Sequence, residues 1–165
     1  MTPRTPLISA GLLVYRYVDC GEPRDVEVLI VHPGGPLWAR KDDGAWSIPK
    51  GLVEPDEDHL PAARREFAEE LGQNPPDGAV IALGEVRLKS GKRVVAFAVE
   101  GTLDVSDVVS NTFEMPWPPR SGRLQRFPEV DRAQWSTPDD ARRKLNPAQA
   151  GLVDRLVDAL RAETR

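Results

Sequence analysis

Three glutamates near the middle of the chain have a spacing that could serve metal-dependent chemistry. Glu66, Glu69 and Glu70 follow one another at i, i+3 and i+4, so on an α-helix their carboxylates share one face. Carboxylate oxygens are ligands that Mg²⁺ prefers, and a metal held by them can neutralise phosphate charge and activate water. The alternative is an acidic helix face that is only solvated. Arg65 stands four residues before Glu69 and could pair with it.

The flanking residues predict the helix that would carry these glutamates. Asp58 can cap its N-terminus, Pro61 is tolerated in the first turn, and Gly72 is typical of the left-handed residue that ends a helix. We therefore expect a helix from about Asp58 to Leu71. Its buried stripe would pack against a sheet and consists of Leu60, Ala63, Phe67 and Leu71.

The stretch from Gly51 to Gln73 reads GLVEPDEDHLPAARREFAEELGQ. Its pattern, G-x5-E-x7-R-E-F-x-E-E-x-G, resembles the signature of the Nudix hydrolase superfamily at seven fixed identities. The last signature position is usually aliphatic but is Gln73 here, a departure that concerns packing. The resemblance implies an α/β protein with one domain over residues 1–165. Its fold would be an α/β/α sandwich with a mixed sheet, and a loop–helix–loop would carry the signature.

The resemblance also implies a metal site that binds Mg²⁺, with Mn²⁺ as a substitute. Its ligands would be Glu66, Glu69 and Glu70, joined by the Gly51 carbonyl. Glu57 would be an outer ligand through water, or the partner that orients Arg65.

The resemblance assigns the catalytic roles to the same region. Glu66, Glu69, Glu70 and Arg65 form the predicted catalytic set, in which Arg65 holds a glutamate in place and Glu66 or Glu70 could be the general base. Because the base varies within the family, Glu114 and Glu129 stay candidates.

Residues outside the signature would select the substrate. Lys50 directly precedes Gly51, and the run W-S-I-P-K-G resembles the one before the signature in diadenosine polyphosphate hydrolases. Lys50 is therefore a candidate phosphate ligand, with a solvent-facing lysine as the alternative. Further candidates are Trp38 for stacking on a base, and Arg40, Lys41 and Arg123 for additional phosphates. The tyrosine common after the signature in those hydrolases is absent, which leaves base recognition open.

Composition favours a globular protein in a reducing compartment. The net charge of −4 gives no general reason for binding nucleic acid, and no long apolar run suggests a membrane span. Cys20 is the only cysteine, so no internal disulfide can form, and we expect an idle thiol and a cytoplasmic location. His32 and His59 lack a zinc-ligand pattern, so His32 is expected to be structural, with a place in the pocket lining as the alternative.

Hydrophobic periodicity predicts strands and helices in mixed order. Val105 to Val109 and Thr112 to Trp117 are weaker strand candidates, and Pro118 to Pro128 is interpreted as an irregular basic loop. The clearer predicted strands are Leu7 to Val18, Val26 to Val31, Val80 to Lys89 and Arg93 to Glu100, with a turn around Gly21 to Pro23, a short extended piece at Trp46 to Ile48, and helices at Pro138 to Lys144 and from Pro147 onward.

The leading hypothesis is a Mg²⁺-dependent hydrolase of a diphosphate bond in nucleoside polyphosphates, with dinucleoside tetraphosphates first. One alternative is a hydrolase of another diphosphate, such as a diphosphoinositol, a nucleotide sugar or a damaged nucleoside triphosphate. The other is a non-catalytic nucleotide-binding module, a class that often loses the signature glutamates present here. The expected partner is a small nucleotide, without a stable nucleic-acid complex or a membrane, for a monomer or homodimer.

Overall fold

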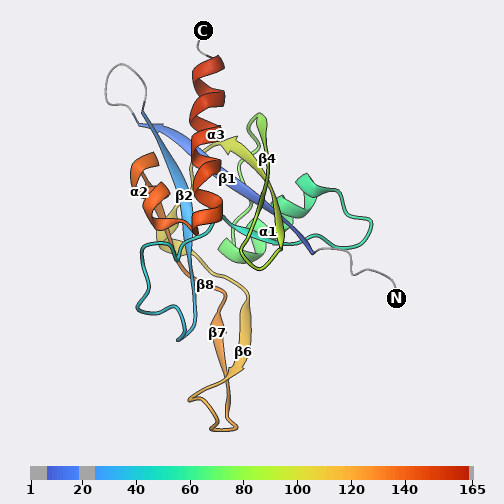
Figure 1. The fold of residues 1–165 in the computed structure, drawn as a ribbon, viewed down its shortest axis with the longest axis vertical. Helices are drawn as coiled ribbons and strands as arrows, with labels where there is room; N and C mark the ends of the chain where they lie inside the picture. Colours follow the sequence, from blue (N-terminus) through green and yellow to red (C-terminus); the bar gives the residue numbers. More distant parts are fainter. Residues whose placement is uncertain (1–6, 19–24, 164–165) are drawn as a thin grey trace.

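A mixed β-sheet lies at the centre of the protein, with helices on both faces (Figure 1). The computed structural model describes residues 7–18 and 25–163; Cys20 and the turn expected at Gly21 to Pro23 lie outside them. In chain order the elements are β1 (Ile8–Val18), β2 (Asp25–Pro33), β3 (Lys50–Leu52), α1 (His59–Leu71), β4 (Val80–Arg87), β5 (Arg93–Glu100), the 3₁₀ turn η1 (Val105–Asp107), β6 (Thr112–Pro116), β7 (Leu124–Pro128), β8 (Val130–Ser136), α2 (Pro138–Lys144) and α3 (Pro147–Glu163).

The sheet has the strand order β4-β5-β1-β2-β8, with β3 paired to β1 beside this path. Strands β1 and β5 are parallel, whereas the other pairs in this sheet are antiparallel. Strand β2 pairs with β1 only from Tyr15 to Val18. The other half of this edge of β1 pairs with β3, where Gly11 lies opposite Lys50. The segment before the glutamate helix is therefore built into the sheet, where β1 and β2 separate.

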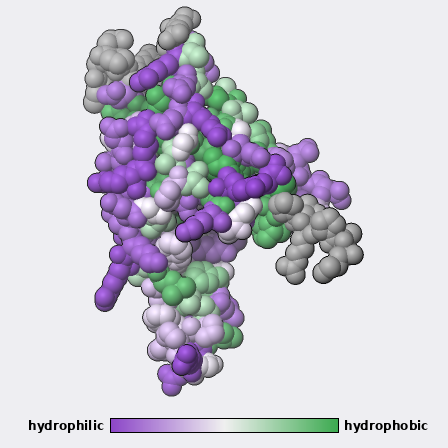
Figure 2. Space-filling view, in the orientation of Figure 1, coloured by the Kyte–Doolittle hydropathy of each residue, from purple (hydrophilic) through white to green (hydrophobic). Residues whose placement is uncertain are grey.

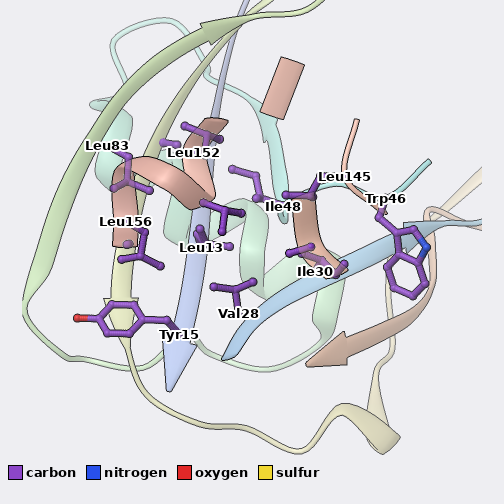
Figure 3. Close-up of a cluster of buried hydrophobic side chains, with 14 of the residues drawn as sticks. Leu13, Tyr15, Val28, Ile30, Trp46, Ile48, Leu83, Leu145, Leu152 and Leu156 are labelled. Carbon is purple, nitrogen blue, oxygen red and sulfur yellow. The ribbon is translucent and has the colours of Figure 1, made fainter. Parts of the chain in front are cut away.

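Alternating side chains on the strands form two cores, one on each face of the sheet. Leu13 of β1 and Ile30 of β2 pack with helices α2 and α3, together with the buried Trp46 and Ile48 (Figure 3). Leu12 of β1 and its neighbours on the opposite face pack against α1. This period of two, with apolar residues on both faces, is expected for strands covered by helices on both sides. The predicted α/β/α sandwich is confirmed.

Helix α1 is close to its predicted form. It ends at Leu71, and Gly72 follows in the left-handed conformation with φ 70°. Asp58 occupies the N-cap position, but its side chain makes no capping hydrogen bond. The buried residues of the helix are Ala62, Ala63, Phe67 and Leu71, and Leu60 is partly buried beside them.

Two predictions in the second half of the chain are wrong, and one strand was missed. Residues Val105–Asp107 form a 3₁₀ turn in place of a strand, because the Asp104 side chain accepts a hydrogen bond from the Ser106 amide and caps the turn. The expected loop over Pro118 to Pro128 contains β7, which pairs with β6 in a hairpin that projects from the body. Strand β8, which was not expected, pairs with β2 and forms the edge of the main sheet.

The projecting hairpin exposes several hydrophobic side chains. Figure 2 shows hydrophobic side chains on this arm among hydrophilic ones. Phe113 and Phe127 face each other near its base, with 6.0 Å between ring centroids, and Leu124 is 66% exposed.

Candidate active site

Arg65 organises the acidic face of α1. Its guanidinium donates two hydrogen bonds of 2.9 Å to the two carboxylate oxygens of Glu57, in the paired geometry that suits arginine. It also donates to Glu66 at 2.8 Å, to Glu69 at 3.3 Å and to the Leu52 carbonyl at 3.1 Å. The predicted pairing with Glu69 and the alternative in which Glu57 orients Arg65 are thus both present as contacts.

The side chain of Glu57 connects the loop before α1 to the helix. It accepts hydrogen bonds from Arg65 and from the Glu54 backbone amide. These contacts lower the pKa of Glu57 to about 2, with the Arg65 hydrogen bond as the largest cause. Contact with Glu57 and Glu66 raises the pKa of Arg65 above its usual value, so the guanidinium stays charged.

Glu66 lies against the backbone of the segment that precedes α1. A Cβ atom placed on Gly51 would overlap the Glu66 carboxylate, so only glycine leaves room for this contact. The Glu66 side chain is only 13% exposed. Its burial raises the pKa of Glu66, an effect that the Arg65 hydrogen bond opposes and the nearby Glu69 and Glu129 reinforce.

Glu70 is held at the same segment, one residue earlier. Its Oε2 atom accepts a hydrogen bond of 3.2 Å from the Lys50 amide. Burial raises the pKa of Glu70 to about 8, against the opposing effects of the Lys50 charge and amide. Burial is also the main reason why the pKa of Lys50 is lowered, with Lys92 acting in the same direction and Glu70 and Glu66 opposing it. The structure thus places Lys50 beside Glu66 and Glu70, where a phosphate ligand is expected.

The three helix glutamates share a face but do not form a ready-made metal centre. Within residues 7–18 and 25–163, no group of three or more His, Cys, Asp or Glu side chains is placed to hold a metal ion. Expectation and structure differ here because Arg65 engages Glu69 and one oxygen of Glu66, while Glu70 is held by the Lys50 amide.

The donor set nevertheless fits a hard divalent cation in its chemistry. Glu66 and Glu70 supply oxygen atoms, and burial disfavours their charged forms. A nearby cation would favour those charged forms and reverse both pKa shifts. The contact of Glu66 with Gly51 also places the Gly51 backbone beside the Glu66 carboxylate.

Glu129 is a carboxylate near this pair that the signature does not contain. It lies between β7 and β8 and contributes to the raised pKa values of Glu66 and Glu70. Its amide donates to the Asn111 carbonyl, and the Asn111 amide donates to the Glu69 carbonyl at the end of α1. Glu114, the other candidate base, is paired with Arg126 at 3.3 Å in the projecting hairpin.

The predicted substrate-binding residues fall into two groups besides Lys50. Trp38, Arg40 and Lys41 are exposed in the loop after β2, where the Lys41 ammonium lies 4.9 Å from the centre of the Trp38 ring. Arg123 is exposed just before β7, in the connection of the projecting hairpin. The loop approaches the hairpin base, because a Cβ on Gly35 would lie 2.8 Å from the Phe113 ring.

A separate cavity of about 580 Å³ lies at the other end of β1 from the Gly11–Lys50 pairing. Two of its charged lining residues, Arg16 and Glu27, form an ion pair at 2.9 Å. The signature glutamates do not line it; its lining residues are Arg16, Tyr17, Val18, Glu27, Glu100, Gly101 and Thr102. Among the described residues, no helix is both long and apolar enough to span a bilayer.

Sequence reasoning missed the connection between His32 and its surroundings. His32 is completely buried, which confirms its expected structural position, but its partners Lys41 and Asp131 were not foreseen. Sequence reasoning also gave Glu129 only a minor role, as one of the candidate bases. Ala133 and Trp135, which are two residues apart and both pack toward the α1 core, were the available signal that a strand follows Glu129.

Comparison with known proteins gives a family match over most of the chain. The model of the NUDIX domain matches residues 19–156. An RNA pyrophosphohydrolase of Halorhodospira halophila is 41% identical over 59 residues, a match that spans 34% of this chain and only 33% of that protein.

Solved structures of low sequence identity have the same fold. The Ap4A hydrolase of C. elegans, in a binary complex, superposes with a TM-score of 0.60 at 20% identity, covering 93% of this chain and 98% of that one. The NUDIX domain of Shewanella oneidensis NrtR, bound to ADP ribose, has a TM-score of 0.63 at 17% identity, with coverages of 97% and 94%. A MutT protein of Methanosarcina mazei gives 0.59 at 20% identity, with coverages of 97% and 99%.

Proposed function

This chain belongs to the NUDIX domain family, and from that premise we propose that it is a pyrophosphohydrolase that cleaves a diphosphate bond in nucleoside polyphosphates, with dinucleoside tetraphosphates first. The observation that carries this proposal is the placement of Glu66 and Glu70 against the backbone of Gly51 and Lys50. Two largely buried carboxylates beside a lysine suit a substrate that brings both a cation and a phosphate chain.

The proposed metal ligands are Glu66 and Glu70, with the Gly51 carbonyl and, once released from Arg65, Glu69. Glu57 is proposed as an outer ligand through water. Mg²⁺ is the proposed ion, because it prefers carboxylate oxygens and retains several of its own waters. When bound there, a divalent ion would neutralise phosphate charge and lower the pKa of the attacking water.

The chain's own residues have distinct proposed tasks. The Lys50 ammonium would bind phosphate oxygens beside the reacting phosphorus. Glu70, Glu66 or Glu129 would accept a proton from the attacking water. The water oxygen bonds to phosphorus as the P–O bond to the bridging oxygen breaks, and the displaced phosphate group leaves with that bridging oxygen. Arg65 would keep Glu66 in place through the contact described above, and would hold Glu69 until a cation binds.

The substrate preference is supported by cations beyond Lys50. Arg40 and Lys41 lie in the loop after β2 and Arg123 in the hairpin, so a long phosphate chain could meet several of them. Trp38 would stack on a nucleobase. The fold that this chain shares with the Ap4A hydrolase of C. elegans supports the choice of such a substrate.

A second candidate is the removal of diphosphate from an RNA 5′ end. It is favoured by the 59-residue similarity to an RNA pyrophosphohydrolase. It also agrees with a projecting hairpin that carries Arg120, Arg123 and Arg126, which could follow a nucleic-acid backbone beyond the reacting phosphates.

The experiment measures hydrolysis across a substrate panel, with the products separated and quantified by anion-exchange chromatography. The panel contains diadenosine tetraphosphate, 5′-triphosphorylated RNA, ADP-ribose, a diphosphoinositol phosphate, a nucleotide sugar and an oxidised nucleoside triphosphate, each with Mg²⁺, Mn²⁺ or EDTA. We expect the highest kcat/KM for diadenosine tetraphosphate, and no hydrolysis of any substrate with EDTA. A preference for RNA selects the second candidate. Nucleotide binding without product in either metal would favour the non-catalytic module.

A further inference from the structure

His32 is a buried polar side chain to which the proposed chemistry assigns no task. It lies near the end of β2 with 0% exposure. Its Nε2 atom is 2.7 Å from the Lys41 carbonyl oxygen, and its Nδ1 atom is 3.0 Å from Oδ1 of Asp131 in β8. The ring also meets Trp46 edge to face, at 5.1 Å between centroids.

These contacts are specific. A carbonyl oxygen can only accept, so Nε2 carries hydrogen and donates it to Lys41. A fully buried imidazole needs partners for its ring nitrogens, because an unsatisfied polar group in the interior is costly. His32 therefore joins two segments that are distant in sequence: the loop after β2, nine residues on, and the start of β8, ninety-nine residues on.

The loop that His32 holds is the one that presents the predicted base-stacking and phosphate-binding groups. Lys41 is the residue whose carbonyl is held, and its ammonium lies over the ring of Trp38. The Lys41 amide donates to the Trp38 carbonyl at 2.9 Å, so the two residues belong to one turn. Farther along the loop, Asp42 is tied separately, by the Trp46 indole at 2.7 Å.

The other partner of His32 leads to the acidic face. Asp131 stands two residues after Glu129, whose charge acts on Glu66 and Glu70. Gly34, at the start of the loop, donates to the Glu129 carbonyl at 2.9 Å. A rigid connection through His32 thus relates the Trp38–Lys41 turn to the side of the molecule where the phosphate chain would be cleaved.

We propose that His32 is a positioning residue, which fixes the Trp38–Lys41 turn against β8 and so sets how tightly a polyphosphate nucleotide is held. This inference rests on the proposed function, because it takes the turn to contact the substrate. His32 itself touches neither substrate nor metal, and it acts through the Lys41 carbonyl.

Two substitutions of similar polarity separate the two contacts of the ring. In His32→Gln the side-chain amide reaches the place of Nε2 and can still donate to the Lys41 carbonyl. In His32→Asn the shorter amide reaches only the place of Nδ1 and keeps Asp131 as its partner. We expect KM for diadenosine tetraphosphate to rise about tenfold in His32→Asn with kcat within about twofold, and to stay near the wild-type value in His32→Gln.

A readout independent of activity accompanies the kinetics. Hydrogen–deuterium exchange of residues 34–45 should be faster in His32→Asn than in His32→Gln, whose exchange should resemble that of the wild type. If the wild-type protein cleaves no nucleoside polyphosphate, the proposed function is wrong. The exchange data would still test whether His32 holds the loop. Equal exchange in the two variants, or equal KM together with equal losses of thermal stability, would overturn the positioning role.

Discussion

The acidic face of α1 and the β6–β7 hairpin both carry charged side chains, but they hold them in different ways. On α1, Arg65 contacts Glu57, Glu66, Glu69 and the Leu52 carbonyl, and Gly51 and Lys50 fix the remaining groups through the backbone. In the hairpin, the ion pair of Arg126 and Glu114 has side chains 68% and 52% exposed.

This difference separates two requirements of the proposed reaction. Bond cleavage needs groups that are placed in advance, because rate depends steeply on geometry. Recognition of the group attached to the diphosphate can use exposed side chains, each of which contributes little. Substitutions should therefore have large effects around α1 and small ones in the hairpin, and the following experiments test that contrast.

The largest effect is expected from Glu70→Gln. Loss of the carboxylate should lower metal-dependent kcat by about 10²- to 10⁴-fold, because both a metal ligand and a candidate base are removed. Steady-state formation of the nucleotide products measures this, with Glu85→Gln on the edge strand β4 as the matched control that should keep its activity. Glu69→Gln should also lose turnover, and normal activity in both Glu69→Gln and Glu70→Gln would refute the assignment.

Glu70→Gln should lower activity but raise the stability of the folded protein. The raised pKa of Glu70 means that the folded protein binds a proton more tightly than the unfolded chain between the ordinary value of 4.5 and about 8. In this window the wild-type protein loses stability as the pH rises. Without metal, Glu70→Gln should therefore have the higher Tm at pH 8, and this difference should shrink toward pH 4.5. A lower Tm for Glu70→Gln than for the wild-type protein at pH 8 in EDTA would contradict the interpretation that the buried, charged Glu70 side chain destabilises the fold.

The second largest effect is expected from Gly51→Ala. The added Cβ would overlap the Glu66 carboxylate and displace it, with a loss of about 1–3 kcal/mol in the free energy of unfolding and about 100-fold in kcat. Chemical denaturation and kinetics measure the two losses. Gly151→Ala in α3 is the control, because a Cβ there meets no atom within 4 Å. It should leave activity unchanged and stability equal or higher.

A smaller effect is expected from Glu57→Gln in acid. The depressed pKa of Glu57, about 2 against an ordinary 4.5, implies stability that is present above pH 4.5 and lost as the pH falls toward 2. The Tm of the wild-type protein should thus fall more steeply across this window than that of Glu57→Gln. Parallel Tm profiles would show that the Arg65–Glu57 contact does not stabilise the folded state.

The smallest effect is expected from Arg123→Ala in the hairpin. An exposed cation contributes little, so KM for diadenosine tetraphosphate should rise only about two- to threefold, and this difference should vanish at high salt. Arg87→Ala on the edge strand β4 serves as the control for net charge. A loss in Arg123→Ala as large as that in Glu70→Gln would remove the contrast between the two regions.

Much of the fold and of the acidic site could be predicted because the signals are local. The bounds of α1, its left-handed Gly72 and its buried face follow from residues within a few turns of one another. The contact between Arg65 and Glu69 follows from helical spacing. Strands β4 and β5 were expected for the same reason, since two strand-like runs are joined by a tight turn around Ser90 and Gly91.

The glutamate helix, the family and the proposed class of chemistry therefore follow from the sequence alone. Only the tertiary structure decided that Lys50 and Gly51 pair with β1, that β8 completes the sheet, and that His32 connects Lys41 to Asp131. These contacts join residues up to about a hundred positions apart, and no local periodicity encodes such a pairing. Their geometry depends on how the two cores pack on the sheet, and that packing sets where the loops of the proposed substrate site lie.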